Sequence, residues 1–117
     1  MIALAQKLFD LSFLELLNDK KFVVQVIELY LLDSQKDMRE LRHAAEEPDF
    51  DTVYKITHKL KSSTGMLQAN ALYELFEQIE KAGKQGDEKE LIPQLVETAS
   101  LEYDRLRYEL KLFLNKN

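Results

Sequence analysis

The chain has 117 residues, of which 45% are hydrophobic and 32% charged, so its size and composition are those of one globular domain, residues 1–117. It contains no cysteine and only two histidines, which excludes a disulfide scaffold, a thiolate zinc site and a three-histidine metal site. Its 16 basic and 21 acidic residues give a net charge of −5, which argues against nucleic-acid binding because nucleic-acid-binding domains usually carry a basic surplus.

The N-terminal region predicts no targeting or membrane segment. Met1 to Lys7 lack the charged region, long apolar stretch and small-residue cleavage site of a secretory signal. The most apolar run, Phe22 to Leu32, is interrupted by Gln25 and Glu28, whereas crossing a bilayer takes about twenty apolar residues. We therefore expect a cytoplasmic protein that does not enter a membrane.

Capping residues predict two helices in the first part of the chain. Ser12 followed by Glu15 matches a capping box, which predicts a short helix from Ser12 to Leu17 with Ser12 as its N-cap. Asp19 then supplies the N-cap of a long helix, Lys20 to Glu46. The apolar positions of the long helix recur every three or four residues: Val23, Ile27, Tyr30, Leu31, Met38, Leu41 and Ala45.

The middle of the chain predicts a third helix. Pro48 ends the preceding helix, and Asp49 can cap a helix from Phe50 to Leu67. Two small threonines belong to the apolar face of this helix, which consists of Val53, Ile56, Thr57, Leu60, Thr64 and Leu67.

Two further helices are predicted after a break at Gln68 to Asn70. The fourth helix ends at Gly83 to Gly86. Asp87 can cap the next helical segment, and Pro93 suits the first turn of the last helix. The apolar stripes of these two helices are Leu72, Leu75, Phe76 and Ile79, and then Leu95, Ala99, Leu106, Leu110, Phe113 and Leu114.

No segment alternates with a period of two over a useful length, so the predicted fold class is all-α. Short connections place consecutive helices antiparallel. The sequence therefore predicts an up-down-up-down four-helix bundle with a short extra helix at its N-terminal end.

Helical phase places one histidine in a chemically suggestive strip. His58 is about 150° away from the core position Leu60, so its ring is expected to face solvent. Lys61, Ser62 and Gly65 follow three, four and seven residues later, on the same strip of surface. A neutral imidazole is a nucleophile near neutral pH, and a neighbouring ammonium can partly neutralise a phosphoryl group. The alternative interpretation is an ordinary solvated surface.

The segment His58 to Ala69 resembles the signature of histidine-containing phosphotransfer (HPt) domains. The shared pattern is a histidine, then Leu60, Lys61, small residues, and an aliphatic residue before the turn. Two positions depart from it: Ser62 and Gln68 stand where a glycine is common. We expect the second departure to change the turn locally without loss of the acceptor.

The resemblance extends over nearly the whole chain. Asp10 to Leu14 resembles the opening of many bacterial members of the family. Residues 22–41 resemble their long first bundle helix, and residues 72–80 resemble the helix that packs behind the histidine. The chain is thus similar to the HPt family in its framework as well as in its motif.

The resemblance implies a role in a multistep phosphorelay. His58 would accept a phosphoryl group from the aspartyl phosphate of one receiver domain and pass it to the aspartate of another. The partners would be receiver domains of response regulators or of a hybrid histidine kinase. The receiver would supply Mg²⁺ and most of the catalysis, so the chain itself would act as a monomeric carrier with no cofactor and no autonomous catalytic activity.

The resemblance also implies roles for three neighbours of the acceptor. Lys61 would stabilise the phosphohistidine charge, with Lys59 as an auxiliary. Glu80 matches a position whose side chain can hold the inner ring nitrogen of His58, which would leave the outer nitrogen free to attack. The alternative for Glu80 is an ordinary surface carboxylate.

A second apolar strip on the long helix suggests a docking surface. Phe22, Val26 and Leu29 lie away from the core phase. They could receive the receiver domain beside Ser62 and Gly65, whose small size leaves room for a partner. Alternatively, they could lie under the short N-terminal helix.

Two other functions are alternatives to the relay: a two-metal carboxylate enzyme and a docking module. Glu40 and His43 form one Glu-x-x-His motif of a two-metal carboxylate site, but Lys55 stands where the second motif at His58 would need a Glu. We interpret His43 as a surface residue that suits the C-terminal end of its helix. The second rival is a helical docking module that never carries phosphate.

Overall fold

The structure, a computed structural model, describes residues 8–17, 19–86 and 89–116, and in these residues it contains helices and turns but no strand. A single 3-10 turn, η1, precedes the last helix in this part of the chain. The all-α prediction is therefore confirmed. The elements are α1 (Ser12–Leu17), α2 (Lys20–Glu46), α3 (Phe50–Met66), α4 (Asn70–Gln85), η1 (Lys89–Leu91) and α5 (Ile92–Asn115).

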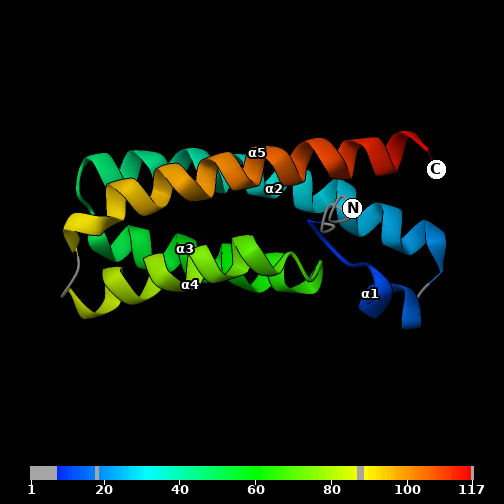
Figure 1. Ribbon diagram of the computed structural model, residues 1–117, viewed down its shortest axis with the longest axis horizontal. Coiled ribbons are helices and arrows are strands. Elements are labelled where there is room, and N and C mark those ends of the chain that lie inside the picture. Colours follow the sequence, from blue (N-terminus) through cyan, green and yellow to red (C-terminus); the bar gives the residue numbers. More distant parts are fainter. Residues whose placement is uncertain (1–7, 18, 87–88, 117) are drawn as a thin grey trace, which may run out of the picture.

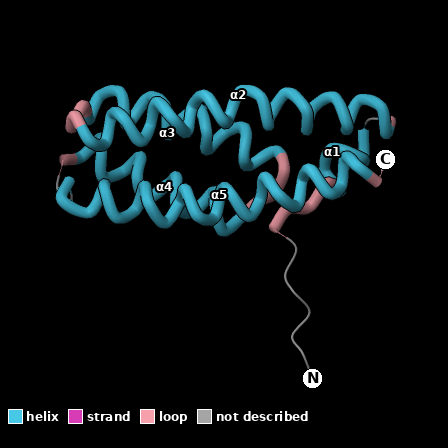
Figure 2. Tube along the Cα trace, turned by 90° about the horizontal axis from the view of Figure 1, so that it is seen from above, coloured by secondary structure: helices cyan, strands magenta, loops and turns pink. Residues whose placement is uncertain are grey.

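Helices α2 to α5 form a four-helix bundle in which each helix runs antiparallel to the next (Figure 1). α3 packs between α2 and α4, and α5 packs between α4 and α2, which closes the ring. The view from above shows the same arrangement, with α1 at one end of the bundle (Figure 2). This arrangement is compatible with the predicted up-down-up-down bundle with a short additional helix.

Side-chain caps fix the starts of α2 and α3, as predicted. Asp19 Oδ1 accepts a hydrogen bond from the backbone N of Phe22 at 2.9 Å, and Asp49 Oδ1 accepts one from Thr52 at 3.2 Å. At the other end, α4 stops at Gly86, whose φ of 77° lies in the left-handed region that favours glycine. Local sequence therefore sets these helix ends before any packing is considered.

The start of α1 differs from the prediction. Asp10, and not Ser12, provides the cap: its Oδ1 accepts the hydrogen bond from the backbone N of Ser12 at 2.9 Å. The Ser12 hydroxyl instead donates to Oε1 of Gln68, at 3.4 Å, in the turn between α3 and α4. The tertiary contact thus competes with the local cap.

The start of the last helix is predicted from two residues. The predicted cap at Asp87 lies outside the described residues, and Pro93 stands in the first turn of α5 as predicted.

The core fixes the rotation of α3 within the bundle. All six residues of its predicted apolar face are buried. Two buried hydrogen bonds tie the neighbouring helices: Tyr30 to Thr64 at 2.9 Å, and Ser34 to Tyr103 at 2.7 Å. Burial raises the pKa of the Tyr30 hydroxyl, which keeps it protonated as a partner for the threonine. The opposite face of α3 is consequently presented to solvent.

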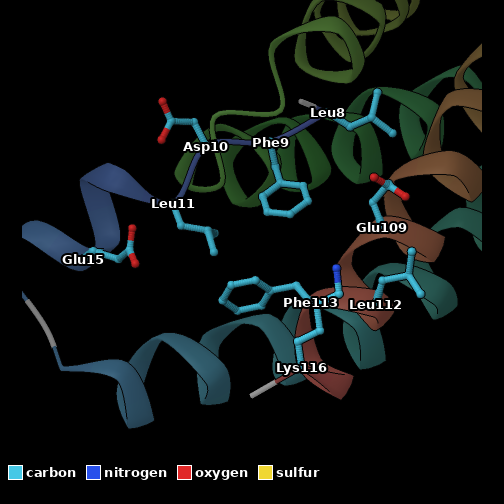
Figure 3. A pocket seen from close by; sticks show the side chains of 9 residues that line it. All are labelled: Leu8, Phe9, Asp10, Leu11, Glu15, Glu109, Leu112, Phe113 and Lys116. Atoms are coloured by element: carbon cyan, nitrogen blue, oxygen red, sulfur yellow. The ribbon is translucent and has the colours of Figure 1, made fainter. Parts of the chain in front are cut away.

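Residues 8–11 and α1 cover the end where α2 and α5 extend past the two shorter helices (Figure 1). Leu11 and Leu14 are buried there, and Phe9 packs edge-to-face on Phe113 with ring centroids 6.3 Å apart. Both rings line a pocket of about 370 Å³ (Figure 3). None of the described helices has the length and apolar content that a membrane crossing requires.

Candidate functional site

His58 projects from the middle of α3 on the face opposite the core. Its side chain is 60% exposed, while Leu60, two residues on, is fully buried. The predicted orientation is confirmed. Tyr54, one helical turn earlier, stacks beside the imidazole with ring centroids 6.2 Å apart, and its ring lies 5.9 Å from the ammonium of Lys84.

Glu80 is a nearly buried carboxylate beside the histidine. Its side chain is 11% exposed, and its Oε2 lies 2.5 Å from Nδ1 of His58. The interpretation of Glu80 as an ordinary surface carboxylate is therefore wrong. α4 stays packed on α3 one turn further along, at Gly83, where a Cβ would be in ordinary van der Waals contact, 3.5 Å, with backbone atoms of Phe50 and Tyr54.

Lys61 shares the same carboxylate. Its Nζ donates to Oε1 of Glu80 at 2.6 Å, and its side chain is 20% exposed. The lysine therefore lies on the histidine's side of α3, but its ammonium is paired with Glu80 and does not extend freely into water. One carboxylate thus holds both the imidazole and the ammonium.

The charge state of Glu80 determines which ring nitrogen is available. Burial alone would raise the pKa of Glu80, but the hydrogen bonds and positive charge of Lys61 and His58 hold it below its usual value. The hydrogen bond to Glu80 in turn raises the pKa of Lys61. An ionised carboxylate has no proton to donate, so in the neutral imidazole Nδ1 of His58 carries the hydrogen and Nε2 has the lone pair.

Tyr73 of α4 is a further neighbour that sequence reasoning missed. Its ring centroid lies 5.8 Å from Nζ of Lys61, and its ring fills the gap left by Gly65. The spacing of Tyr54 four residues before His58 could have indicated the stacking contact. No sequence signal could have revealed Tyr73, because its contact with α3 depends on how two helices pack.

Two polar residues on α3 make contacts of their own. Nζ of Lys59 lies 3.2 Å from Oδ2 of Asp37, a buried residue of α2, so this lysine points away from Glu80. The hydroxyl of Ser62 donates to the backbone O of His58 at 3.2 Å. Lys59 and Lys61 therefore flank the histidine on opposite sides, toward α2 and α4 respectively.

The second apolar strip is exposed. Phe22 is 44% exposed and Leu29 is 58% exposed, so α1 does not bury them. Val26 is half-buried, and it lines a groove of about 220 Å³ together with Leu29 and Met66. Lys59, which precedes the core position Leu60 and follows His58 in sequence, also lines this groove, whereas His58 itself does not.

His43 is a surface residue, as predicted: its Nε2 lies 3.8 Å from Oε1 of Glu47, and both side chains are well exposed. Within residues 8–17, 19–86 and 89–116, no group of three histidine, aspartate or glutamate side chains is placed to hold a metal ion.

A four-helix bundle with an exposed, carboxylate-oriented histidine in mid-helix defines the class of histidine phosphotransfer domains. The sequence model of the Hpt domain matches residues 25–111, and the chain belongs to this family. Its role is phosphotransfer in a phosphorelay, with receiver domains as partners, which confirms the relay prediction.

The fold is also that of a solved bacterial structure. The chain is similar to histidine-containing phosphotransfer protein B from Pseudomonas aeruginosa PAO1, with a TM-score of 0.86 and 21% sequence identity over 97% of this chain and 98% of that one. A search of curated proteins found no match.

Proposed function

We propose that Nε2 of His58 is the phosphoacceptor. The observation that carries this proposal is the hydrogen bond of Nδ1 to Glu80, which leaves Nε2 as the available nitrogen of an exposed ring. The Nε2 lone pair attacks the phosphorus of an aspartyl phosphate, the bond from phosphorus to the carboxylate oxygen breaks, and the aspartate carboxylate leaves. The reverse attack by the aspartate of a second receiver removes the phosphoryl group.

The proposed attack creates positive charge on the ring, because a neutral imidazole becomes a phosphoimidazolium that retains its Nδ1 proton. Glu80 is placed to stabilise that charge through the same hydrogen bond. Lys61 and Lys59 add positive charge on the two flanks of the phosphoryl group. Their help at a largely exposed site is modest, about 1 kcal/mol.

The receiver, in this proposal, supplies Mg²⁺ and the catalytic groups, while this chain supplies the oriented imidazole and a docking surface as a monomer without a cofactor. We propose that Phe22, Val26 and Leu29 contact the receiver, together with Ser62 and Gly65 close to the acceptor. An exposed apolar strip beside a charged rim is typical of transient interfaces.

The test is transfer of labelled phosphate from a phosphorylated receiver domain, followed by a chase with an unphosphorylated receiver. We expect acid-labile label on the wild-type chain that the second receiver removes, none on His58→Gln, and normal labelling of His43→Gln. A chain that binds the receiver but takes no label would instead be a docking module.

A further inference from the structure

We infer that Tyr73 is a positioning residue for the acceptor, acting through Lys61 and Glu80 on His58. The inference rests on the proposed role of His58. The Tyr73 ring lies 5.8 Å from the Lys61 ammonium and next to Gly65 of α3, so it would act on the imidazole indirectly.

The place of the tyrosine ring is set by a missing side chain on α3. A Cβ at Gly65 would lie 3.4 Å from Cδ2 of Tyr73 and 3.3 Å from Cε2, the shorter distance being tighter than most Cβ contacts. Gly65 lies one helical turn after Lys61, so the ring rests against α3 next to the lysine. Gly65 thus accommodates a ring of its own chain.

The ring and the carboxylate together confine the lysine. The Lys61 ammonium lies 5.8 Å from the centroid of Tyr73, within the range of a cation–π contact, and 2.6 Å from Oε1 of Glu80. Solvent-exposed lysines exchange among many rotamers, and their ion pairs are weak. The Lys61 side chain is only 20% exposed, which favours one arrangement of the pair.

A confined Lys61 fixes the orientation of Glu80. While Oε1 is held by the ammonium, Oε2 remains directed at Nδ1 of His58. Loosening the lysine would let the carboxylate rotate and would weaken its preference for the Nδ1-protonated ring. Residues that orient a reactive histidine from behind commonly change function without touching the reacting atom.

The experiment measures the ¹⁵N chemical shifts of His58, which distinguish the two neutral tautomers, at a pH of about 8, where an imidazole is normally neutral. We expect Tyr73→Ala to raise the Nε2-protonated population and to slow phosphotransfer by roughly two- to fivefold. Tyr73→Phe, which keeps the ring, should show the wild-type tautomer populations and the wild-type rate of phosphotransfer. Tyr108→Ala, at an exposed tyrosine of α5, is the matched control.

Further variants keep the inference testable if Tyr73→Ala does not fold. Tyr73→Leu fills most of the space without an aromatic face, so it should shift the tautomers in the same direction. In a Lys61→Gln background, a Tyr73 substitution should add nothing further. Wild-type tautomer populations and rates in both Tyr73→Ala and Tyr73→Leu would overturn the inference. It would also be overturned if a Tyr73 substitution changed the tautomers and the rate as much in the Lys61→Gln background as in the wild type. A wild-type chain that takes no phosphate would contradict the proposed function instead.

Discussion

Glu80 of α4 and His58 of α3, which are 22 residues apart in sequence, are joined by a hydrogen bond between a nearly buried carboxylate and an exposed ring. The two residues differ in burial because they have different roles. Glu80 is sheltered enough to remain in one orientation, and His58 remains open to a protein partner. Removing the carboxylate should therefore affect reactivity more than fold.

The first prediction concerns the identity of residue 80. Glu80→Ala should slow phosphotransfer by roughly tenfold or more, because a charge-assisted hydrogen bond contributes about 1.5–3 kcal/mol. Glu80→Gln should be intermediate, since its amide oxygen can accept from Nδ1 but carries no charge. Glu77→Gln, one turn earlier on α4, is the control. Rates from a phosphorylated receiver should rank wild type, Gln, then Ala; equal rates would contradict the role of Glu80.

The second prediction concerns acid stability. The pKa of Glu80 is lower in the folded protein than in the unfolded chain, where a glutamate titrates near pH 4.3. Its contribution to the free energy of unfolding is therefore present above about pH 4.3 and is lost as the pH falls through the folded value. Urea unfolding from about pH 7 to about pH 3 should show the gap between wild type and Glu80→Gln narrowing in acid. A gap that widens would be inconsistent with this sign.

The third prediction concerns the ion pair between α3 and α2. Lys59→Ala should lower the free energy of unfolding by about 1 kcal/mol, because it leaves the carboxylate of Asp37, which is 8% exposed, without its cation. Asp37→Asn in the same chain should recover part of the loss. Lys55→Ala, which breaks an exposed pair with Asp51, is the control and should have a smaller effect. Equal effects of the two lysine substitutions would argue against this role for Asp37.

The fourth prediction concerns the turn between α3 and α4. Gln68 has a φ of 51°, in the left-handed region that strains any residue except glycine. Gln68→Gly should raise the free energy of unfolding by up to about 1 kcal/mol, despite the loss of the long hydrogen bond from Ser12. Thermal and urea unfolding measure the change. A destabilised variant would mean that the contact with Ser12 outweighs the strain.

The fifth prediction concerns docking. Leu29→Glu should weaken binding of the receiver domain without unfolding the chain, because Leu29 is 58% exposed and lines the groove that also includes Lys59. Leu101→Glu on α5 makes the same substitution at a residue that is 63% exposed. Calorimetric titration should show weaker binding for the first variant only. Equal binding by both variants would place the docking surface elsewhere.

The framework of this protein could be predicted from sequence because its signals are local. Asp19, Asp49 and Gly86 set helix ends through groups within a few residues, and the stripe around Leu60 fixes which face of α3 is buried. The exposure of His58 follows from that stripe by helical geometry alone.

The surroundings of the acceptor could not be predicted in the same way. The burial of Glu80 and the contact of Tyr73 with Gly65 depend on the separation and rotation of two helices. The cap of α1 differs from the sequence prediction for a related reason, because Ser12 hydrogen-bonds to the distant Gln68. Spacing identifies residues that share one helix face, but not residues that meet across a helix interface.

Mapping the phosphorylated residue tests the central claim most directly. After incubation with a phosphorylated receiver, the chain would be digested and sequenced by tandem mass spectrometry at alkaline pH, where phosphohistidine survives. We predict phosphate on His58 and none on His43. Phosphate on another residue, or none on a chain that binds the receiver, would contradict the assignment of His58 as the acceptor.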